Sequence, residues 1–169
     1  MNQIHEIYNQ DKLKFYALLC AKVKAFTENE KNYIPNLANA SAFIYEYMQN
    51  LNWAGFYLIN GTQLVLGPFQ GKPACIRIDM GKGVCGTAAL TQSTQLVEDV
   101  HKFPGHIACD CASNSEIVIP IHYKGKVVAV LDIDSPILNR FDQIDKQGLE
   151  NLVKILEQSC DFSLPVINF

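Results

Sequence analysis

Six cysteines are the residues of this sequence with the clearest capacity for chemistry. They are Cys20, Cys75, Cys85, Cys109, Cys111 and Cys160. In a chain without an export signal, cysteines are buried apolar residues, metal ligands or reactive thiols, because reducing compartments do not favour structural disulfides. Four of the six lie between Gly67 and Ser115, a stretch rich in glycine and proline. Long irregular segments in compact domains are usually functional or disordered, so this stretch is the first candidate for a functional site.

Three interpretations of these thiols are open from the residues alone. Each can be a structural thiol, as we expect for Cys20 on an apolar helical stripe and for Cys160 near a helix end. A zinc site would use Cys109, Cys111, His101 and His106. The chain has no Cys-x2-Cys pair, however, and Cys-x-Cys is awkward for tetrahedral chelation.

The third interpretation is thiol redox chemistry. In this chemistry one thiolate attacks an oxidised substrate, and a second thiol resolves the resulting sulfenic acid as a disulfide. Cys109 lies in a loop-like sequence that suits attack, and either Cys75 or Cys85 suits resolution. Cys85 also lies in a glycine turn that leads into a predicted short helix.

Three carboxylates converge at the open end of one predicted hairpin. They are Glu116, Asp132 and Asp134. The runs 115–123 and 126–134 alternate around a Lys-Gly pair, which predicts a tight antiparallel turn. Counting the register from that turn places Glu116 opposite residue 133, so the two aspartates flank it. Because like charges in proximity raise at least one pKa, the cluster must bind a cation or hold a proton for general acid catalysis.

Trp53 and Tyr57 lie on one face of another predicted strand, residues 52–59, which meets an Asn-Gly turn and continues as a second apolar run. Such an aromatic pair is most often part of a core. Beside the three carboxylates, it would form one wall of a pocket for a small ligand.

Helices surround these predicted strands. Apolar spacing predicts helices in the N-terminal third, a second one beginning near Pro35, and a last helix capped by Asp142. We expect Ile144, Leu149, Leu152 and Leu156 to form the buried stripe of the last helix. The order favours a single α+β domain over residues 1–169, with an antiparallel sheet flanked by helices and residues 1–29 packed on it as a helical segment.

Composition excludes several classes of function. The chain has 169 residues, 49% of them hydrophobic, and a net charge of −3 without a basic run, which disfavours nucleic acid as a partner. The longest apolar stretch, Phe15 to Ala21, is shorter than the roughly 20 residues of a membrane span. The N-terminus has no signal-peptide pattern, so we expect a cytoplasmic protein with no membrane partner.

Several segments, in the same order, resemble free methionine-(R)-sulfoxide reductases of the GAF-domain family. They are LGPFQGKPAC at 66–75, GVCGTA at 83–88, DVH at 99–101, GHIACD at 105–110, ASNSEIV at 112–118, VLDIDS at 130–135 and RF at 140–141. The resemblance covers about residues 30–158. It implies a GAF-like fold, a homodimer, free methionine-(R)-sulfoxide as substrate, thioredoxin as reductant, and no metal or organic cofactor.

The resemblance also implies roles for individual residues. Cys109 would be the attacking thiol, Cys75 the principal resolving thiol and Cys85 a third thiol near the substrate. The implied pocket residues are Trp53, Tyr57, Glu116, Asp132 and Asp134, with Asp110 in the motif as well. Cys111 departs from the family pattern, in which a small residue without a thiol follows Cys-Asp.

These observations predict a thioredoxin-dependent oxidoreductase that converts free L-methionine-(R)-S-oxide to L-methionine. Attack by Cys109 would leave a sulfenic acid while one of the carboxyls protonates the departing oxygen, and an intramolecular disulfide would follow. The alternative is a non-catalytic GAF module that senses a small ligand, which would need the pocket but not the thiols.

Overall fold

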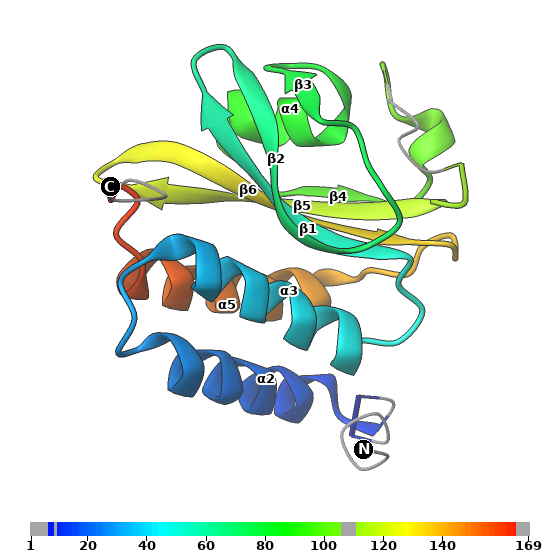
Figure 1. The fold of residues 1–169 in the computed structure, drawn as a ribbon. Helices are drawn as coiled ribbons and strands as arrows, with labels where there is room; N and C mark the ends of the chain where they lie inside the picture. The colour runs from blue at the N-terminus through cyan, green and yellow to red at the C-terminus, as the bar shows by residue number, and fades with distance from the viewer. Residues whose placement is uncertain (1–6, 9, 106–110, 165–169) are drawn as a thin grey trace.

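The computed structural model describes residues 7–8, 10–105 and 111–164. Within these residues, six strands form one antiparallel sheet in the order β3-β2-β1-β6-β5-β4 (Figure 1). The strands are β1 (Trp53–Asn60), β2 (Gln63–Gly71), β3 (Arg77–Asp79), β4 (Gln95–Val97), β5 (Ser115–Tyr123) and β6 (Lys126–Ser135). The helices are α2 (Lys12–Thr27), α3 (Tyr33–Tyr47), α4 (Gly83–Thr91) and α5 (Gln143–Ser159), with a 3-10 turn, η1 (Val100–Lys102). The predicted α+β class with an antiparallel sheet and flanking helices is confirmed.

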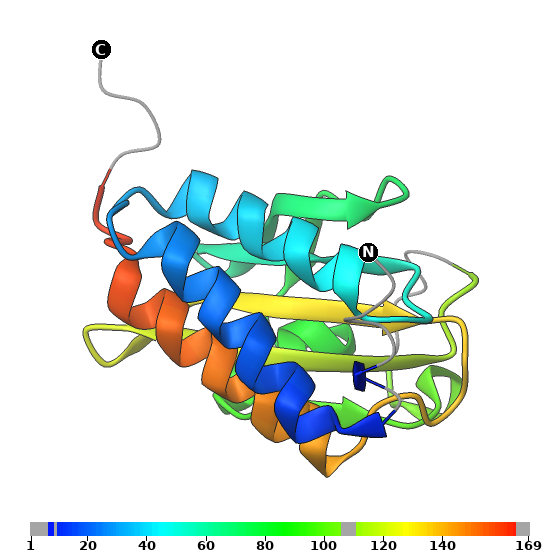
Figure 2. The ribbon, with the colours of Figure 1, turned by 90° about the horizontal axis from the view of Figure 1, so that it is seen from below.

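The helices divide between the two faces of the sheet. Helices α3 and α5 cover one face, with α2 packed on them as a further layer, and α4 lies on the opposite face (Figures 1 and 2). The apolar side chains of β5 and β6 that face α3 and α5, such as Ile117 and Ile133, belong to the larger core. Val118 and Val130, from the same two strands, belong to a second cluster under α4. Alternate side chains of each strand therefore pack into two different cores, one on each face of the sheet.

Both predicted hairpins are present, but the register of one differs from the expectation. His122 pairs with Val127 as expected, whereas Glu116 lies opposite Asp134 and not opposite residue 133. The cause is an irregularity opposite Ile121 and His122, where β6 contains one additional residue, Val128, between Val127 and Ala129.

The stretch between β2 and β5 contains more regular structure than its glycines and prolines indicate. It folds into β3, the expected short helix α4, β4 and η1. Cys75 lies before β3, which begins only at Arg77. Among the described residues, no helix is both long enough and apolar enough to cross a membrane.

The last helix begins as the sequence predicts. The Asp142 side chain accepts hydrogen bonds from the backbone N–H groups of Ile144 and Asp145, completing a capping box. Leu149, Leu152 and Leu156 are fully buried, but Ile144 is exposed and lies outside the buried stripe. The prediction for Ile144 is wrong because this residue belongs to the first turn, at the edge of the packed layer.

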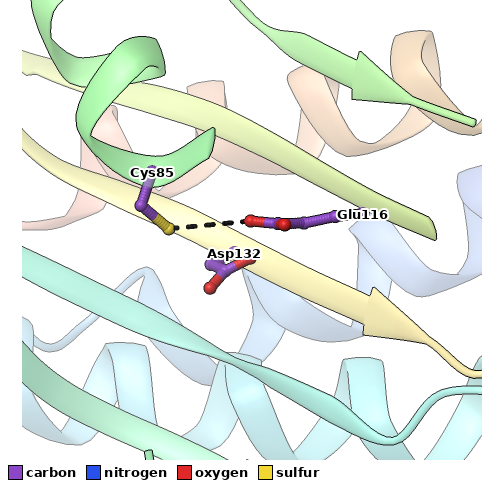
Figure 3. Close-up of side chains that lie close together, drawn as sticks. All are labelled: Cys85, Glu116 and Asp132. Carbon is purple, nitrogen blue, oxygen red and sulfur yellow. Dashed lines mark hydrogen bonds between the residues drawn. The ribbon is translucent and has the colours of Figure 1, made fainter. Parts of the chain in front are cut away.

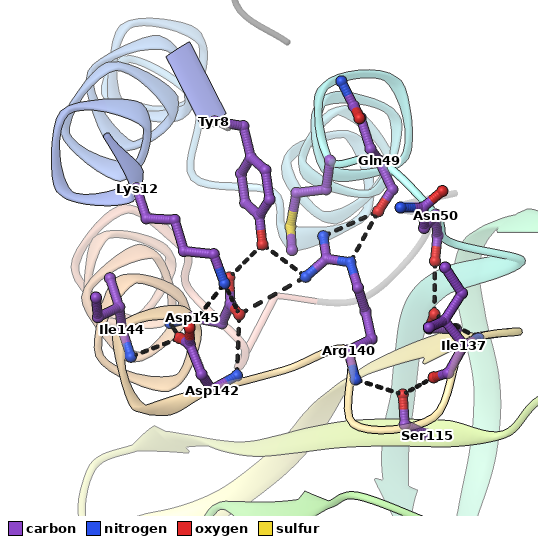
Figure 4. A network of polar contacts seen from close by, with 12 residues as sticks. Tyr8, Lys12, Gln49, Asn50, Ser115, Ile137, Arg140, Asp142, Ile144 and Asp145 are labelled. Atoms are coloured by element: carbon purple, nitrogen blue, oxygen red, sulfur yellow. Dashed lines mark hydrogen bonds and ion pairs between the residues drawn. The ribbon is translucent and has the colours of Figure 1, made fainter. Parts of the chain in front are cut away.

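A buried carboxylate joins α2 to α5 (Figure 4). Asp145 is fully buried and accepts hydrogen bonds from the Tyr8 hydroxyl at 2.7 Å and from Lys12 Nζ at 2.7 Å. Arg140 donates to the Tyr8 hydroxyl at 2.6 Å and twice to the backbone carbonyl of Gln49, at 3.0 and 2.9 Å. The network therefore ties the N-terminal helix to the loop that leads into β1.

Candidate active site

A pocket opens on the face of the sheet that α4 covers. Its empty space, including the part open to solvent, is about 530 Å3. It is lined by Trp53, Tyr57, Pro73, Ala74, Ile78, Lys82, Gly83, Val84, Cys85, Ser113, Glu116, Asp132 and Asp134. Six of the residues selected from the sequence therefore meet in one place: the two aromatic residues, one cysteine and the three carboxylates.

The strand register explains how the carboxylates meet. Asp134 lies directly opposite Glu116 on β5 and opposite Trp53 on β1, so these three side chains share one row of the sheet. Asp132 lies in the next row on the same face, opposite Gly55 and Val118. The convergence predicted by strand alternation is thus present in spite of the register shift.

Cys85 reaches this cluster from the first turn of α4 (Figure 3). Its Sγ lies 4.0 Å from Glu116 Oε1, and one donor atom each of Cys85, Glu116 and Asp132 lie within 4.8 Å of one another. All three residues are buried. The site therefore combines one thiol with two carboxyl groups on three separate elements.

Burial raises the pKa of each group in this cluster, Cys85, Glu116 and Asp132. Burial, with the charges of Asp132 and Asp134, raises the pKa of Glu116 well above its usual range. Burial raises the pKa of Asp132 to about 6, although hydrogen bonds from Cys85 and Glu116 lower it. Burial, with the charges of Asp132 and Glu116, also raises the pKa of the Cys85 thiol. With a pKa of about 6, Asp132 ionises below neutral pH, whereas Glu116 keeps its proton to a higher pH than an exposed glutamate does.

One oxygen of the cluster has no hydrogen-bond donor. Asp132 is 6% exposed, and its Oδ1 accepts no hydrogen bond from the part of the chain that the structure describes. Lys82 is the cationic side chain among the described lining residues, and it is exposed at the rim. An unpaired buried oxygen of an ionised carboxylate is costly, so this position suits a cationic group of a ligand.

Replacing Asp132 by Asn is expected to stabilise the protein at neutral and alkaline pH. The pKa of Asp132 in the fold, about 6, exceeds the value of about 3.9 in an unfolded chain. Because of this difference, the free energy of unfolding of the wild-type protein falls by roughly 3 kcal/mol as the pH rises from about 4 through 6. Asp132→Asn removes that loss, so in denaturant titrations the variant should exceed wild type at about pH 8 but not at about pH 4.

Asp79→Asn is the matched control, because Asp79 is an exposed carboxylate at the end of β3. The control should show no gain that depends on pH. An equal gain in both variants would contradict the assignment of the cost to burial of Asp132.

Aromatic rings form the other wall of the pocket. The Trp53 ring stacks on Phe69, with centroids 5.3 Å apart, and on Tyr57, at 5.9 Å. Trp53 Nε1 donates to the Lys72 carbonyl at 3.2 Å, and the Tyr57 hydroxyl donates to the Cys75 carbonyl at 3.0 Å. Burial raises the pKa of Tyr57, which keeps this donor protonated. The two rings therefore fix the backbone of residues 72–75 beside the pocket.

Gly55 makes room for this arrangement. A Cβ at this position would lie 2.3 Å from Phe69 Cβ and 2.6 Å from the Trp53 ring. We expect Gly55→Ala to destabilise the protein by about 1–3 kcal/mol and to displace the indole, because overpacking forces neighbouring groups to move. Trp53 is the single tryptophan of the sequence, so its emission spectrum reports the displacement directly.

Gly61→Ala is the control for that spectrum. Gly61 lies in the β1–β2 turn with φ +62°, and nothing lies within 4 Å of a Cβ there. This substitution strains the turn but should leave the tryptophan emission of the folded protein unchanged. Unchanged emission in Gly55→Ala would contradict the predicted displacement.

The cysteines differ in state. Cys75 is disulfide-bonded, whereas Cys20, Cys85, Cys111 and Cys160 are free. Cys109 and Asp110 lie outside the described residues. Cys160 is buried, whereas Cys20, expected in the core, is only half-buried.

The alternative zinc site falls largely outside the described residues as well, since it would need Cys109 and His106. Of its other members, Cys111 is exposed and His101 Nε2 lies 3.0 Å from Asn114 Oδ1. The His101 contact ties η1 to the segment before β5.

Sequence reasoning missed some of the lining residues. Ser113 is buried and its Oγ accepts a hydrogen bond from Asn52 Nδ2 at 2.9 Å. It lies three residues before Glu116, so its closeness to the carboxylates in sequence was an available signal. Ile78 on β3 had no such signal, because only the pairing of β3 with β2 brings it to the pocket.

Comparison with known proteins agrees with this geometry. The GAF domain family matches residues 34–158. Free methionine-R-sulfoxide reductase of Escherichia coli is 53% identical over 148 residues, which cover 88% of this chain and 90% of that protein. The Saccharomyces cerevisiae protein of the same name is 46% identical over 162 residues, covering 91% of this chain and 90% of that one.

A solved structure extends the similarity to three dimensions. It is the X-ray structure of free methionine-R-sulfoxide reductase from Neisseria meningitidis in complex with its substrate, with a TM-score of 0.85 and 42% identity, covering 88% of this chain and 90% of that one. The fold, the pocket and these relatives agree. The chain therefore belongs to the free methionine-R-sulfoxide reductase family of GAF domains.

Proposed function

We propose that this enzyme reduces free L-methionine-(R)-S-oxide to L-methionine by thiol chemistry. The observation that carries the proposal is a pocket in which a buried acid, an ionised carboxylate and an aromatic wall lie next to a segment whose Cys75 is disulfide-bonded. The names of the relatives support the same substrate.

The first step is attack by the Cys109 thiolate on the sulfur of the sulfoxide. The oxygen cannot leave as a bare oxide, so protonated Glu116, whose raised pKa fits this role, donates a proton to it. The oxygen moves to Cys109 as a sulfenic acid, and the sulfoxide is reduced to the thioether of methionine.

The second step regenerates the enzyme. The Cys75 thiol attacks the sulfenic acid of Cys109, water leaves, and a disulfide forms between the two sulfurs. The disulfide at Cys75 supports this assignment, and Cys85, which is free and buried, is then not the resolving thiol. We further propose that thioredoxin supplies the two electrons that reduce the disulfide.

Selection of the free amino acid follows from the charges in the pocket. Asp132 Oδ1 is buried without a donor among the described residues, and the substrate ammonium would supply one. Trp53 and Tyr57 would pack on the S-methyl group, a contact worth about 0.3–1.5 kcal/mol. A methionine sulfoxide within a peptide lacks the ammonium group and would leave the carboxylate unpaired.

The test measures reduction of four sulfoxides to the corresponding thioethers, methionine or N-acetylmethionine, with dithiothreitol as reductant. They are the free R epimer, the free S epimer and the N-acetylated form of each. We expect turnover of the free R epimer alone. Activity towards neither free epimer would favour a non-catalytic GAF sensor, and equal activity on the N-acetylated R epimer would contradict the role given to the ammonium group.

Three further statements belong to the same proposal. The whole chain acts as one GAF-like domain, it works as a homodimer, and it resides in the cytoplasm. The four free cysteines among the described residues support the last statement, because reducing compartments keep thiols unpaired. Gel filtration with light scattering tests the dimer, which a monomeric mass would contradict.

A further inference from the structure

Cys85 is a buried thiol to which the proposed reaction gives no step. It nevertheless lies against Glu116 and Asp132, with which it forms a compact set of one sulfur and two oxygen donors. We propose that Cys85, Glu116 and Asp132 bind a thiophilic divalent cation such as Zn2+, and that the bound cation excludes the amino-acid substrate from the pocket.

The geometry fits a tetrahedral ion after a small contraction. Zinc binds thiolate at about 2.3 Å and carboxylate oxygen at about 2.0–2.2 Å, which puts neighbouring donors roughly 3.5 Å apart. Cys85 Sγ and Glu116 Oε1 are 4.0 Å apart, and the three donor atoms lie within 4.8 Å of one another. Side-chain movements of about 1 Å would close the set around zinc. The fourth position would face the pocket, where water can occupy it.

A second observation points to a cation at this place. Asp132 is only 6% exposed, and its Oδ1 accepts no hydrogen bond from the described residues. Neither Glu116 nor Asp132 forms an ion pair with a described Lys, Arg or His. Two buried carboxyl groups without a basic partner make a strong site for a positive charge.

The thiol determines which cation fits. Carboxylates alone would suit Mg2+ or Ca2+, whereas a sulfur donor favours softer ions such as Zn2+. On binding, the Cys85 thiol and the Glu116 carboxyl group each release their proton to solvent, and the metal–sulfur and metal–oxygen bonds form with no change of oxidation state. A substrate ammonium would use the carboxylates without needing the sulfur. Substrate and metal therefore share Asp132, and only the metal engages Cys85.

The binding claim is tested without turnover. The oxidised protein, in which Cys75 is disulfide-bonded, is titrated with Co2+, and we expect a sulfur-to-cobalt charge-transfer band that Zn2+ removes by displacing cobalt. Zinc-edge X-ray absorption of the wild-type complex should show one sulfur at about 2.3 Å together with oxygens at about 2.0–2.2 Å. This second measurement needs no variant that must fold.

Variants locate the site. Cys85→Ser should abolish the cobalt band, and Asp132→Asn should weaken zinc binding by roughly tenfold or more, since even residues that only orient metal ligands contribute that much. The controls Cys111→Ser and Cys160→Ser, at an exposed and a buried free cysteine, should keep both the band and the affinity. Wild-type affinity in Cys85→Ser, or a zinc spectrum without sulfur, would overturn the proposal.

The exclusion claim rests on the proposed function and has its own outcome. We expect free methionine sulfoxide to suppress the cobalt band and zinc to inhibit turnover competitively. Turnover that is unaffected by saturating zinc would overturn the exclusion. A cobalt band in a protein that reduces neither free epimer would support the metal site and reject the proposed function, so the two failures are distinguishable.

Discussion

Replacement of Cys109 by serine is expected to abolish reduction of free methionine-(R)-sulfoxide. A hydroxyl is a far weaker nucleophile than a thiolate, and removing the nucleophile of a covalent mechanism costs more than roughly a thousandfold in kcat. The loss should appear in kcat and not in substrate affinity, because the pocket remains. Methionine release under saturating dithiothreitol measures kcat. The change of Trp53 emission on titration with substrate measures substrate affinity.

Cys160→Ser is the control, since Cys160 is a buried free cysteine at the end of α5, outside the pocket lining. It should retain full turnover. Cys75→Ser should release one methionine per protein molecule without added reductant and then stop, with a sulfenic acid that dimedone traps. Turnover of Cys109→Ser at the wild-type rate would reject the assigned nucleophile.

Replacement of Glu116 by glutamine is expected to lower kcat by about 10^2–10^4-fold, the usual contribution of a general acid. The amide has a similar shape but cannot donate an acidic proton to the departing oxygen. Burial and the neighbouring carboxylates raise the pKa of Glu116 well above its usual range, so it keeps this proton to a higher pH than an exposed glutamate does. As the pH rises through that raised pKa, wild-type kcat should fall, and the fall should be absent in the variant.

Asp134→Asn serves as the comparison, because Asp134 lies directly opposite Glu116 but is less buried. It should cost less activity and should keep the alkaline fall of kcat. If Glu116→Gln retains that fall, another group supplies the proton.

The hairpin of β5 and β6 shows how far the sequence determines the site. The Lys-Gly turn correctly predicts that His122 pairs with Val127. Continued without a break, however, that register would pair core-facing Ile117 with Asp132. The irregularity after Ile121 resolves the conflict by pairing Ile117 with Ile133. Burial of an apolar face specifies register more strongly than a turn does, and this pattern could have predicted the bulge.

The approach of Cys85 to the carboxylates could not be predicted in the same way. Glycines and the short apolar run predict α4, but its position over β5 and β6 depends on tertiary packing of Val84 and Ala88 against the second core. Strand alternation gives the face on which a side chain lies, whereas nothing local gives the place where a helix docks on that face. The resemblance to a known family supplied the cysteine roles that spacing left open.

The hydrogen bonds from Arg140 to the Gln49 carbonyl have a practical consequence for interpreting variants. A chain shortened to begin after α2 would take away Tyr8, which accepts from Arg140, and Lys12, which donates to buried Asp145. The anchor of the loop that enters β1 would then loosen at Gln49, which lies four positions before Trp53 and is separated from it by Asn50 to Asn52. A loss of activity caused by truncation or substitution at the amino-terminal end should therefore be attributed first to an indirect effect on ligand binding near Trp53.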